Sequence, residues 1–148
     1  MADYAGAVAA ITARLKEQWG DRTPIGVLNE ARPDLVDDNG DPVPAWLFLE
    51  VVGAGSDIVG AGRPGDHRWV YDGLIQIHVF VPVGGGSAEA FRLATDAGEI
   101  FRAAEFYRQD DCCVRSWSPR LDGGDGGSED GMWWRVTATI PFEYLHRG

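Results

Sequence analysis

Four groups of residues have types that could support chemistry, and the first is a glycine turn. Residues 84–87 read Gly-Gly-Gly-Ser between an expected strand and an expected helix, which is where phosphate-binding loops sit. The stretch lacks the lysine of a Walker loop and the third glycine of the dinucleotide fingerprint. A flexible turn from strand to helix is the simpler explanation of these glycines.

The second group is a short acidic stretch that resembles a calcium loop. Asp37, Asn39 and Asp41 alternate along the chain, so their oxygens could converge on a hard cation. However, Gly40 stands at the fourth place instead of the sixth, and Phe48 occupies the twelfth place, where a bidentate Glu belongs. We expect a turn here and no metal site.

The remaining groups are the histidines and the cysteines. His67, His78 and His146 have no metal-ligand spacing. Cys112 and Cys113 are adjacent, a geometry that rarely permits a disulfide, so we expect one buried and one exposed free thiol. No G-x-S-x-G elbow brings a nucleophile to a base. The sequence therefore predicts no enzyme, no cofactor and no metal.

The charge balance limits the kinds of partner that the protein can bind tightly. Thirteen basic residues stand against 23 acidic ones, a net charge of −10. Tight binding to nucleic acid or to an anionic membrane is then disfavoured, because both need clustered cations. No run approaches the roughly 18 apolar residues of a spanning helix, and residues 1–19 lack a signal-peptide pattern. We expect synthesis and retention in the cytoplasm.

Hydrophobic periodicity indicates two helices and five strands. One apolar stripe at helical spacing comprises Tyr4, Val8, Ile11, Leu15 and Trp19. Asp3 can cap this helix and Gly20 can end it. A second helix is expected from Ser87 to about Phe106, and strands at 25–28, 46–52, 69–81, 113–118 and 132–144. Residues 53–65 and 122–131, rich in glycine, are expected to be loops.

This order, α-β-β-β-α-β-β, favours one α+β domain over residues 1–148. Its later connections suit a mostly antiparallel sheet of four to five strands with two helices packed on one face. A chain of this length can bury a sizeable core without disulfides.

The six tryptophans divide between the expected core and the expected surface. Trp19, Trp46 and Trp134 fall on core stripes, whereas others lie at strand ends or on alternate faces. Large aromatics outside the core, beside glycine-rich loops with apolar or basic anchors, are typical of protein interfaces. The predicted subunit-interface residues are Ile58, Val59, Arg63, Trp69, Trp117 and Trp133. The alternative, a second sheet face covered by the chain's own loops, stays open.

Several segments in order along nearly the whole chain carry a resemblance to a known family. They are the helix ending at Trp19 followed by Thr23-Pro24-Ile25, Pro44-Ala45-Trp46-Leu47, residues 53–65, residues 73–82, the glycine turn into the helix ending Ile100-Phe101-Arg102, Trp134-Arg135-Val136 and residues 140–144. Together they resemble the tail terminators of long-tailed phages and gene transfer agents. The acidic, glycine-rich tract at 110–131 departs from that pattern.

The resemblance implies a structural virion protein that forms a ring, usually a hexamer, on the head-proximal end of the tail tube. The ring would stop tube polymerisation and offer a docking surface to the head connector. The implied partners are sister subunits, the tail tube protein and the connector or neck protein. DNA would pass through without specific binding, which the negative charge favours.

Two alternatives remain from the sequence. One is a neck or head-completion protein at the head-tail junction. The other is a small ligand-binding or enzymatic α+β domain with a pocket under residues 53–65, which predicts a deep concave site with converging polar groups.

Overall fold

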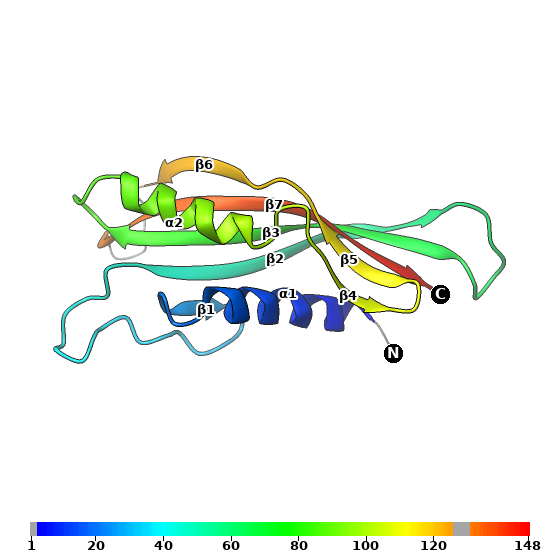
Figure 1. Cartoon of the computed structure of the whole chain (residues 1–148), viewed down its shortest axis with the longest axis horizontal. Helices are drawn as coiled ribbons and strands as arrows, with labels where there is room; N and C mark the ends of the chain where they lie inside the picture. The colour runs from blue at the N-terminus through cyan, green and yellow to red at the C-terminus, as the bar shows by residue number, and fades with distance from the viewer. Residues whose placement is uncertain (1–2, 126–130) are drawn as a thin grey trace.

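The computed structural model describes residues 3–125 and 131–148 as two helices and seven strands (Figure 1). In chain order they are α1 (Tyr4–Trp19), β1 (Ile25–Val27), β2 (Trp46–Val59), β3 (Arg68–Pro82), α2 (Ala88–Glu99), β4 (Glu105–Gln109), β5 (Cys112–Ser116), β6 (Arg120–Asp125) and β7 (Trp133–Arg147). The protein is α+β, as predicted.

The described strands join in one mixed sheet. Its order is β1-β2-β3-β7-β5-β4, and β6 also pairs with β7. β1 runs parallel to β2, and the other pairs are antiparallel. The predicted strand number of four to five and the predicted element order are therefore wrong, although the antiparallel majority is confirmed.

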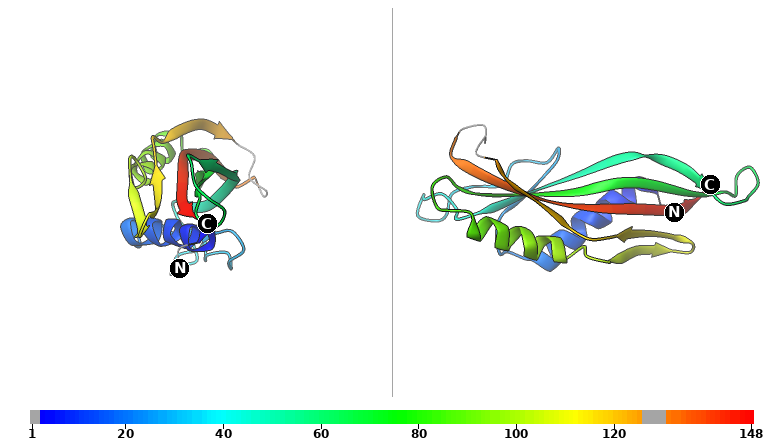
Figure 2. Two further views of the ribbon diagram at one scale, coloured as in Figure 1. Left: turned by 90° about the vertical axis from the view of Figure 1, so that its right-hand side faces the viewer. Right: turned by 90° about the horizontal axis from the view of Figure 1, so that it is seen from above.

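Both helices pack on the same face of the sheet and share its core, as expected. Their buried residues are Ala7, Ile11, Leu15 and Trp19 of α1 and Ala90, Leu93, Ala94 and Ala97 of α2. The sheet contributes alternate residues such as Leu47, Ile77 and Val136, which lie on one face because strand side chains alternate. Figure 2 shows α1 and α2 beside the twisted sheet along its long axis.

The ends of α1 follow the sequence prediction. Oδ1 of Asp3 accepts a hydrogen bond from the backbone N–H of Gly6 at 2.7 Å, which satisfies one free donor of the first turn. Gly20 ends the helix with φ of 65°, a conformation that favours glycine. By contrast, Ser87 stands at the N-cap of α2 without a side-chain capping bond.

The second helix is shorter than predicted because its last expected turn is used for strand pairing. α2 ends at Glu99, and Ala103 takes a left-handed φ of 47°. The chain then enters β4, which pairs with β5. Phe101 and Ala104 are buried as a helical stripe would bury them, so the apolar pattern alone could not separate the two structures.

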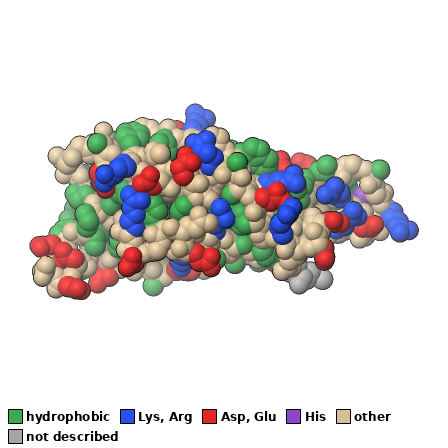
Figure 3. All heavy atoms as spheres, viewed as in Figure 1, with side chains coloured by type: hydrophobic (Ala, Val, Ile, Leu, Met, Phe, Trp, Pro, Cys, Tyr) green, Lys and Arg blue, Asp and Glu red, His purple; other side chains and the backbone are tan. Residues whose placement is uncertain are grey.

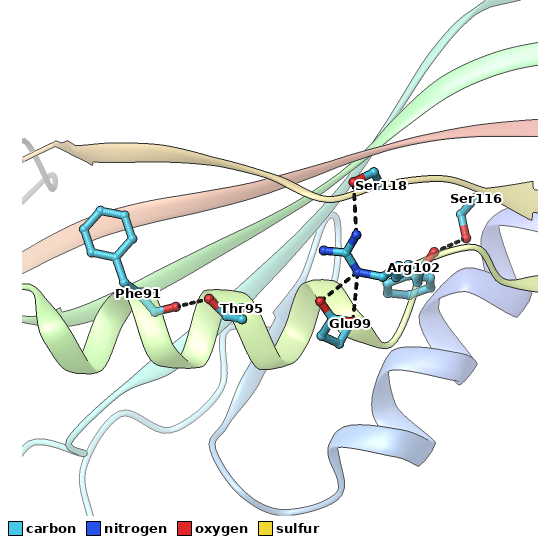
Figure 4. A network of polar contacts seen from close by, with 7 residues as sticks. Phe91, Thr95, Glu99, Arg102, Ser116 and Ser118 are labelled. Atoms are coloured by element: carbon cyan, nitrogen blue, oxygen red, sulfur yellow. Dashed lines mark hydrogen bonds and ion pairs between the residues drawn. The ribbon is translucent and has the colours of Figure 1, made fainter.

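Polar contacts fix the end of α2 to the connection between β5 and β6 (Figure 4). The buried hydroxyl of Ser116 donates to the carbonyl of Phe101 at 2.6 Å. Arg102 bonds Glu99 at 2.8 Å and reaches Oγ of Ser118 at 3.2 Å. These bonds replace the helical turn that the sequence predicts here.

The stretch predicted as a loop at 122–131 begins as a strand. Residues 120–125 form β6 along β7 despite two adjacent glycines. Gly124 is required there because a Cβ would lie 1.6 Å from Cζ2 of Trp134. The rest of the predicted loop, residues 126–130, lies outside the described residues.

The predicted loop at 53–65 is also mostly strand. Residues 53–59 continue β2 against β3 through a β-bulge between Gly53 and Gly55, and Gly55 has φ of 140°. The β2–β3 hairpin extends past both helices, to the right in Figure 1. We call its outer part, residues 57–68, the arm.

Candidate interaction surface

The sheet face opposite the helices, called here the outer face, is covered at one end by the chain itself. Trp46 stacks on Phe80 with ring centroids 4.3 Å apart, and Trp133 meets Trp46 edge-on at 6.2 Å. Val43 and Leu35, from the segment before β2, pack against them. At this end the alternative reading, a sheet face covered by its own loops, is correct.

Trp133 therefore does not belong to an exposed surface. Its side chain is only 5% exposed, so the prediction that it lies outside the interior is wrong. The error arises because period-two alternation assigns Trp133 to the face away from the helices, without indicating that a loop covers that face.

The middle of the outer face carries a polar pair. Nδ1 of His78 lies 2.8 Å from Oγ1 of Thr137, and Nε2 lies 4.0 Å from a carboxylate oxygen of Glu50. Burial lowers the pKa of His78 and nearby Arg135 lowers it further, against a smaller opposing effect of Glu50. The imidazole is thus held neutral, as a packed polar residue of the sheet.

At the far end of the outer face the sheet is open to solvent. A shallow groove of about 490 Å³ is lined by Asp72, Gly73, Leu74, Trp117, Pro141, Phe142 and Glu143. Trp117 is 44% exposed and Leu74 37%, while the backbone N–H of Trp117 bonds the carbonyl of Pro141 at 3.0 Å. We call this feature the outer-face groove.

Two carboxylates border the groove, and neither forms an ion pair with another residue that the structure describes. Asp72 on β3 and Glu143 on β7 are direct partners in the strand register. Like charges placed opposite one another destabilise a sheet, so this pair would gain from an added cation. Arg115 is the register partner of Glu143 on β5, but its guanidinium pairs with Glu105 at 3.7 Å.

The arm presents apolar and basic side chains to solvent. Ile58 is 51% and Val59 46% exposed, and Arg63 and Arg68 are exposed as well. In Figure 3 a basic side chain stands at the right-hand end of the molecule, where the arm ends. The predicted exposure of Ile58, Val59 and Arg63 is confirmed.

The base of the arm is tied to the end of β7. His67 and Gly148 exchange two backbone hydrogen bonds, at 3.0 and 3.1 Å, and Nε1 of Trp69 donates to the Gly148 carbonyl at 3.0 Å. Arg147 pairs with Asp66 at 2.9 Å and with Asp111 at 2.8 Å. Trp69 is thus half-buried and anchors the arm, which is a built hairpin and not the free loop expected from its glycines.

The six predicted interface residues therefore separate into three places. Four lie on or beside the arm, Trp117 lies in the groove, and Trp133 lies inside. The sequence reasoning missed Asp72, Leu74, Pro141 and Glu143. The available signal was Leu74, an apolar residue between Asp72 and Gln76 on the side of β3 away from its core stripe.

Other kinds of site find no support within residues 3–125 and 131–148. No group of three or more His, Cys, Asp or Glu side chains there could hold a metal ion. None of the helices in this part of the chain is long and apolar enough to cross a membrane.

A helix-backed sheet with a projecting hairpin and an open apolar groove is suited to packing against other proteins. Comparison with known families identifies the class: the model of the phage tail terminator protein family matches residues 7–142. The chain belongs to this family, which confirms the resemblance noted in its sequence. It is therefore a structural component of the virion tail with a role in phage tail assembly.

Comparison with solved structures supports the fold. One solved chain superimposes with a TM-score of 0.70 at 21% identity, over 97% of this chain and 96% of that chain. At this identity the likeness shows the fold alone. No curated protein matches the sequence.

Proposed function

We propose that this protein forms a hexameric ring on the head-proximal end of the tail tube. There it ends tube polymerisation and provides the docking surface for the head connector. The observation that carries this proposal is the family match over residues 7–142, which includes nearly all of the described fold. The role is architectural and involves no catalysis.

Two features of the molecule support a self-assembling role. Apolar side chains on the arm and in the outer-face groove are left uncovered by the chain, and covering such surface is what drives association. Residues 53–59, moreover, form a strand instead of part of the loop that the ligand-binding alternative places over a pocket.

The net charge of −10 supports passage of DNA through the ring. A wall of like charge disfavours adsorption of phosphates, whereas clustered cations would hold the DNA. A ring structure with a neutral or basic inner wall would contradict this part of the proposal.

Deletion of the coding region in its phage or prophage, followed by electron microscopy of the particles, tests the function. We expect overlong or headless tails, and restoration by the intact gene supplied in trans. Tails of normal length on filled heads would overturn the proposal. Labelled protein found on DNA-filled heads but not on head-free tails would assign it to head completion.

A further inference from the structure

We propose that the arm of one subunit docks in the outer-face groove of a second copy of the chain. This inference rests on the proposed ring and names the contact through which neighbouring subunits would join. Arm and groove are different surfaces, so their union is a head-to-tail contact that can close into a ring.

The cations of the arm are the first step. Within residues 3–125 and 131–148, the side chains of Arg63 and Arg68 make no hydrogen bond, ion pair or ring contact. Every other Lys or Arg side chain in that part of the chain contacts an acidic group, a carbonyl, an aromatic ring or another polar group. In a chain of net charge −10 this is unexpected, because acidic partners are abundant. The two unpaired cations are concentrated at one end of the molecule.

The apolar residues of the arm are the second step. Ile58 and Val59 sit beside these cations and are about half exposed. β1 pairs with β2 only at residues 47–49, so no described strand covers the outer edge of β2 along the arm. The arm thus offers apolar side chains, an open backbone edge and two positive charges together.

The groove has the complementary features. Its apolar lining comes from Leu74, Trp117 and Pro141, and its border carries the opposed carboxylates Asp72 and Glu143. Two cations entering from another chain would relieve the like-charge contact while Ile58 covers the exposed indole of Trp117. The charged and apolar groups of the arm therefore complement those of the groove.

An arm that enters the groove comes from another copy and not from the same subunit. Arg68 and Asp72 lie on one continuous strand, paired on both sides, so a subunit cannot fold its own arm back into its own groove. The acidic turn at 34–41 attracts cations too, so the test below distinguishes it from the groove.

Photo-crosslinking tests the contact without altering charge. The full chain is made with a photoreactive phenylalanine at position 58 and irradiated both as purified protein and in assembled tails. We expect crosslinks from position 58 to residues 72–74, 117 or 141–143 of a second copy. The matched control is position 83, where Val83 is equally exposed and lies outside the arm.

Charge exchange supplies the second measurement. We expect R63E/R68E alone, or D72R/E143R alone, to lower the copy-to-copy crosslink yield about tenfold, as loss of paired interfacial charges predicts. Mixing the two variants in equal amounts should restore the yield, because each reversed arm meets a reversed groove. R92E is the control for added negative charge, and thermal melting confirms that each variant folds.

The outcomes separate this inference from the proposed function. Crosslinks only to the turn at 34–41, to another tail protein or to nothing, or a mixture no better than either variant, would overturn the arm-to-groove contact. The deletion phenotype would still stand in that case. Normal tails after deletion would instead contradict the proposed ring, whatever the crosslinks show.

Discussion

At the scale of single residues, the outer-face groove depends on a missing side chain. Gly73 leaves room for the ring of Phe142, and a Cβ at position 73 would lie 2.6 Å from Cε1 of Phe142 and from the carbonyl oxygen of Val52. Neither neighbour can retreat easily, since Phe142 is buried in the core and Val52 belongs to the paired strand β2. The floor of the groove at Gly73 is thus formed by the ring of Phe142, which belongs to the core on the helix side of the sheet.

Gly73→Ala is therefore expected to destabilise the fold by about 1–3 kcal/mol, the usual cost of overpacking. Chemical denaturation monitored by tryptophan fluorescence measures the loss. Gly85→Ala is the matched control, because the nearest atom to its Cβ is 3.8 Å away. Equal stability of the two variants would contradict the close packing at Gly73.

His78 makes stability depend on pH. Its pKa is lowered from 6.5 in the fold, by burial first and by Arg135 second, so below pH 6.5 the unfolded chain takes up a proton that the folded chain refuses. Stability contributed by the neutral imidazole is present above pH 6.5 and falls as the pH drops toward the lowered pKa. Melting temperatures across pH 5 to 8 should show this fall, and His78→Asn should flatten it. An unchanged slope in the variant would refute the assignment.

At the scale of elements, the alternation of apolar residues and the helix-capping residues predicted those helices and strands whose burial follows from local sequence. The helix capped by Asp3 and the long strands β3 and β7 could be predicted because one face of each meets the core. β4, β6 and the outer half of β2 could not, since their identity depends on pairing with distant strands.

The same limit applies to the candidate surface. Exposure of Ile58, Val59 and Trp117 followed from their apolar type near glycine or a strand end. The groove was missed because Leu74 and Pro141 become neighbours only when β3 and β7 pair. Trp133 was misplaced because the segment that covers it is remote in sequence.

The tie between α2 and β5 gives a prediction for these elements. Ser116→Ala leaves the buried carbonyl of Phe101 without the hydroxyl donor and should cost about 1–3 kcal/mol. Ser118→Ala, at an exposed site that only accepts from Arg102, should change stability by less than about 0.5 kcal/mol. Urea denaturation of the two variants compares them. A larger loss from Ser118→Ala would show that the exposed contact fixes the helix end.

At the scale of the whole molecule, charge is distributed unevenly along the long axis. The unpaired cations lie on the arm, while acidic side chains gather at the opposite, left-hand end in Figure 3. A molecule with this distribution is steered into head-to-tail encounters before any apolar surface meets.

Association of copies should accordingly weaken with salt. Raising ionic strength from about 0.05 M to about 0.5 M shortens the screening length from roughly 14 Å to roughly 4 Å. The arm's cations then attract carboxylates over a shorter distance. Sedimentation velocity at matched protein concentrations should show fewer oligomers at high salt. The R63A/R68A variant, which removes the two cations, should show little salt response, and equal sensitivity in both proteins would place the electrostatics elsewhere.

The bulge between Gly53 and Gly55 has a further consequence for the uncovered edge of β2. A straight, uncovered strand edge invites identical chains to stack without limit into fibrils. Here the ladder between β2 and β3 slips by one residue between Gly53 and Gly55, within the part of β2 whose other edge is uncovered, so a flat strand cannot stay in register along it. We expect the kink to limit such stacking while it leaves the edge open to a partner that follows the bend.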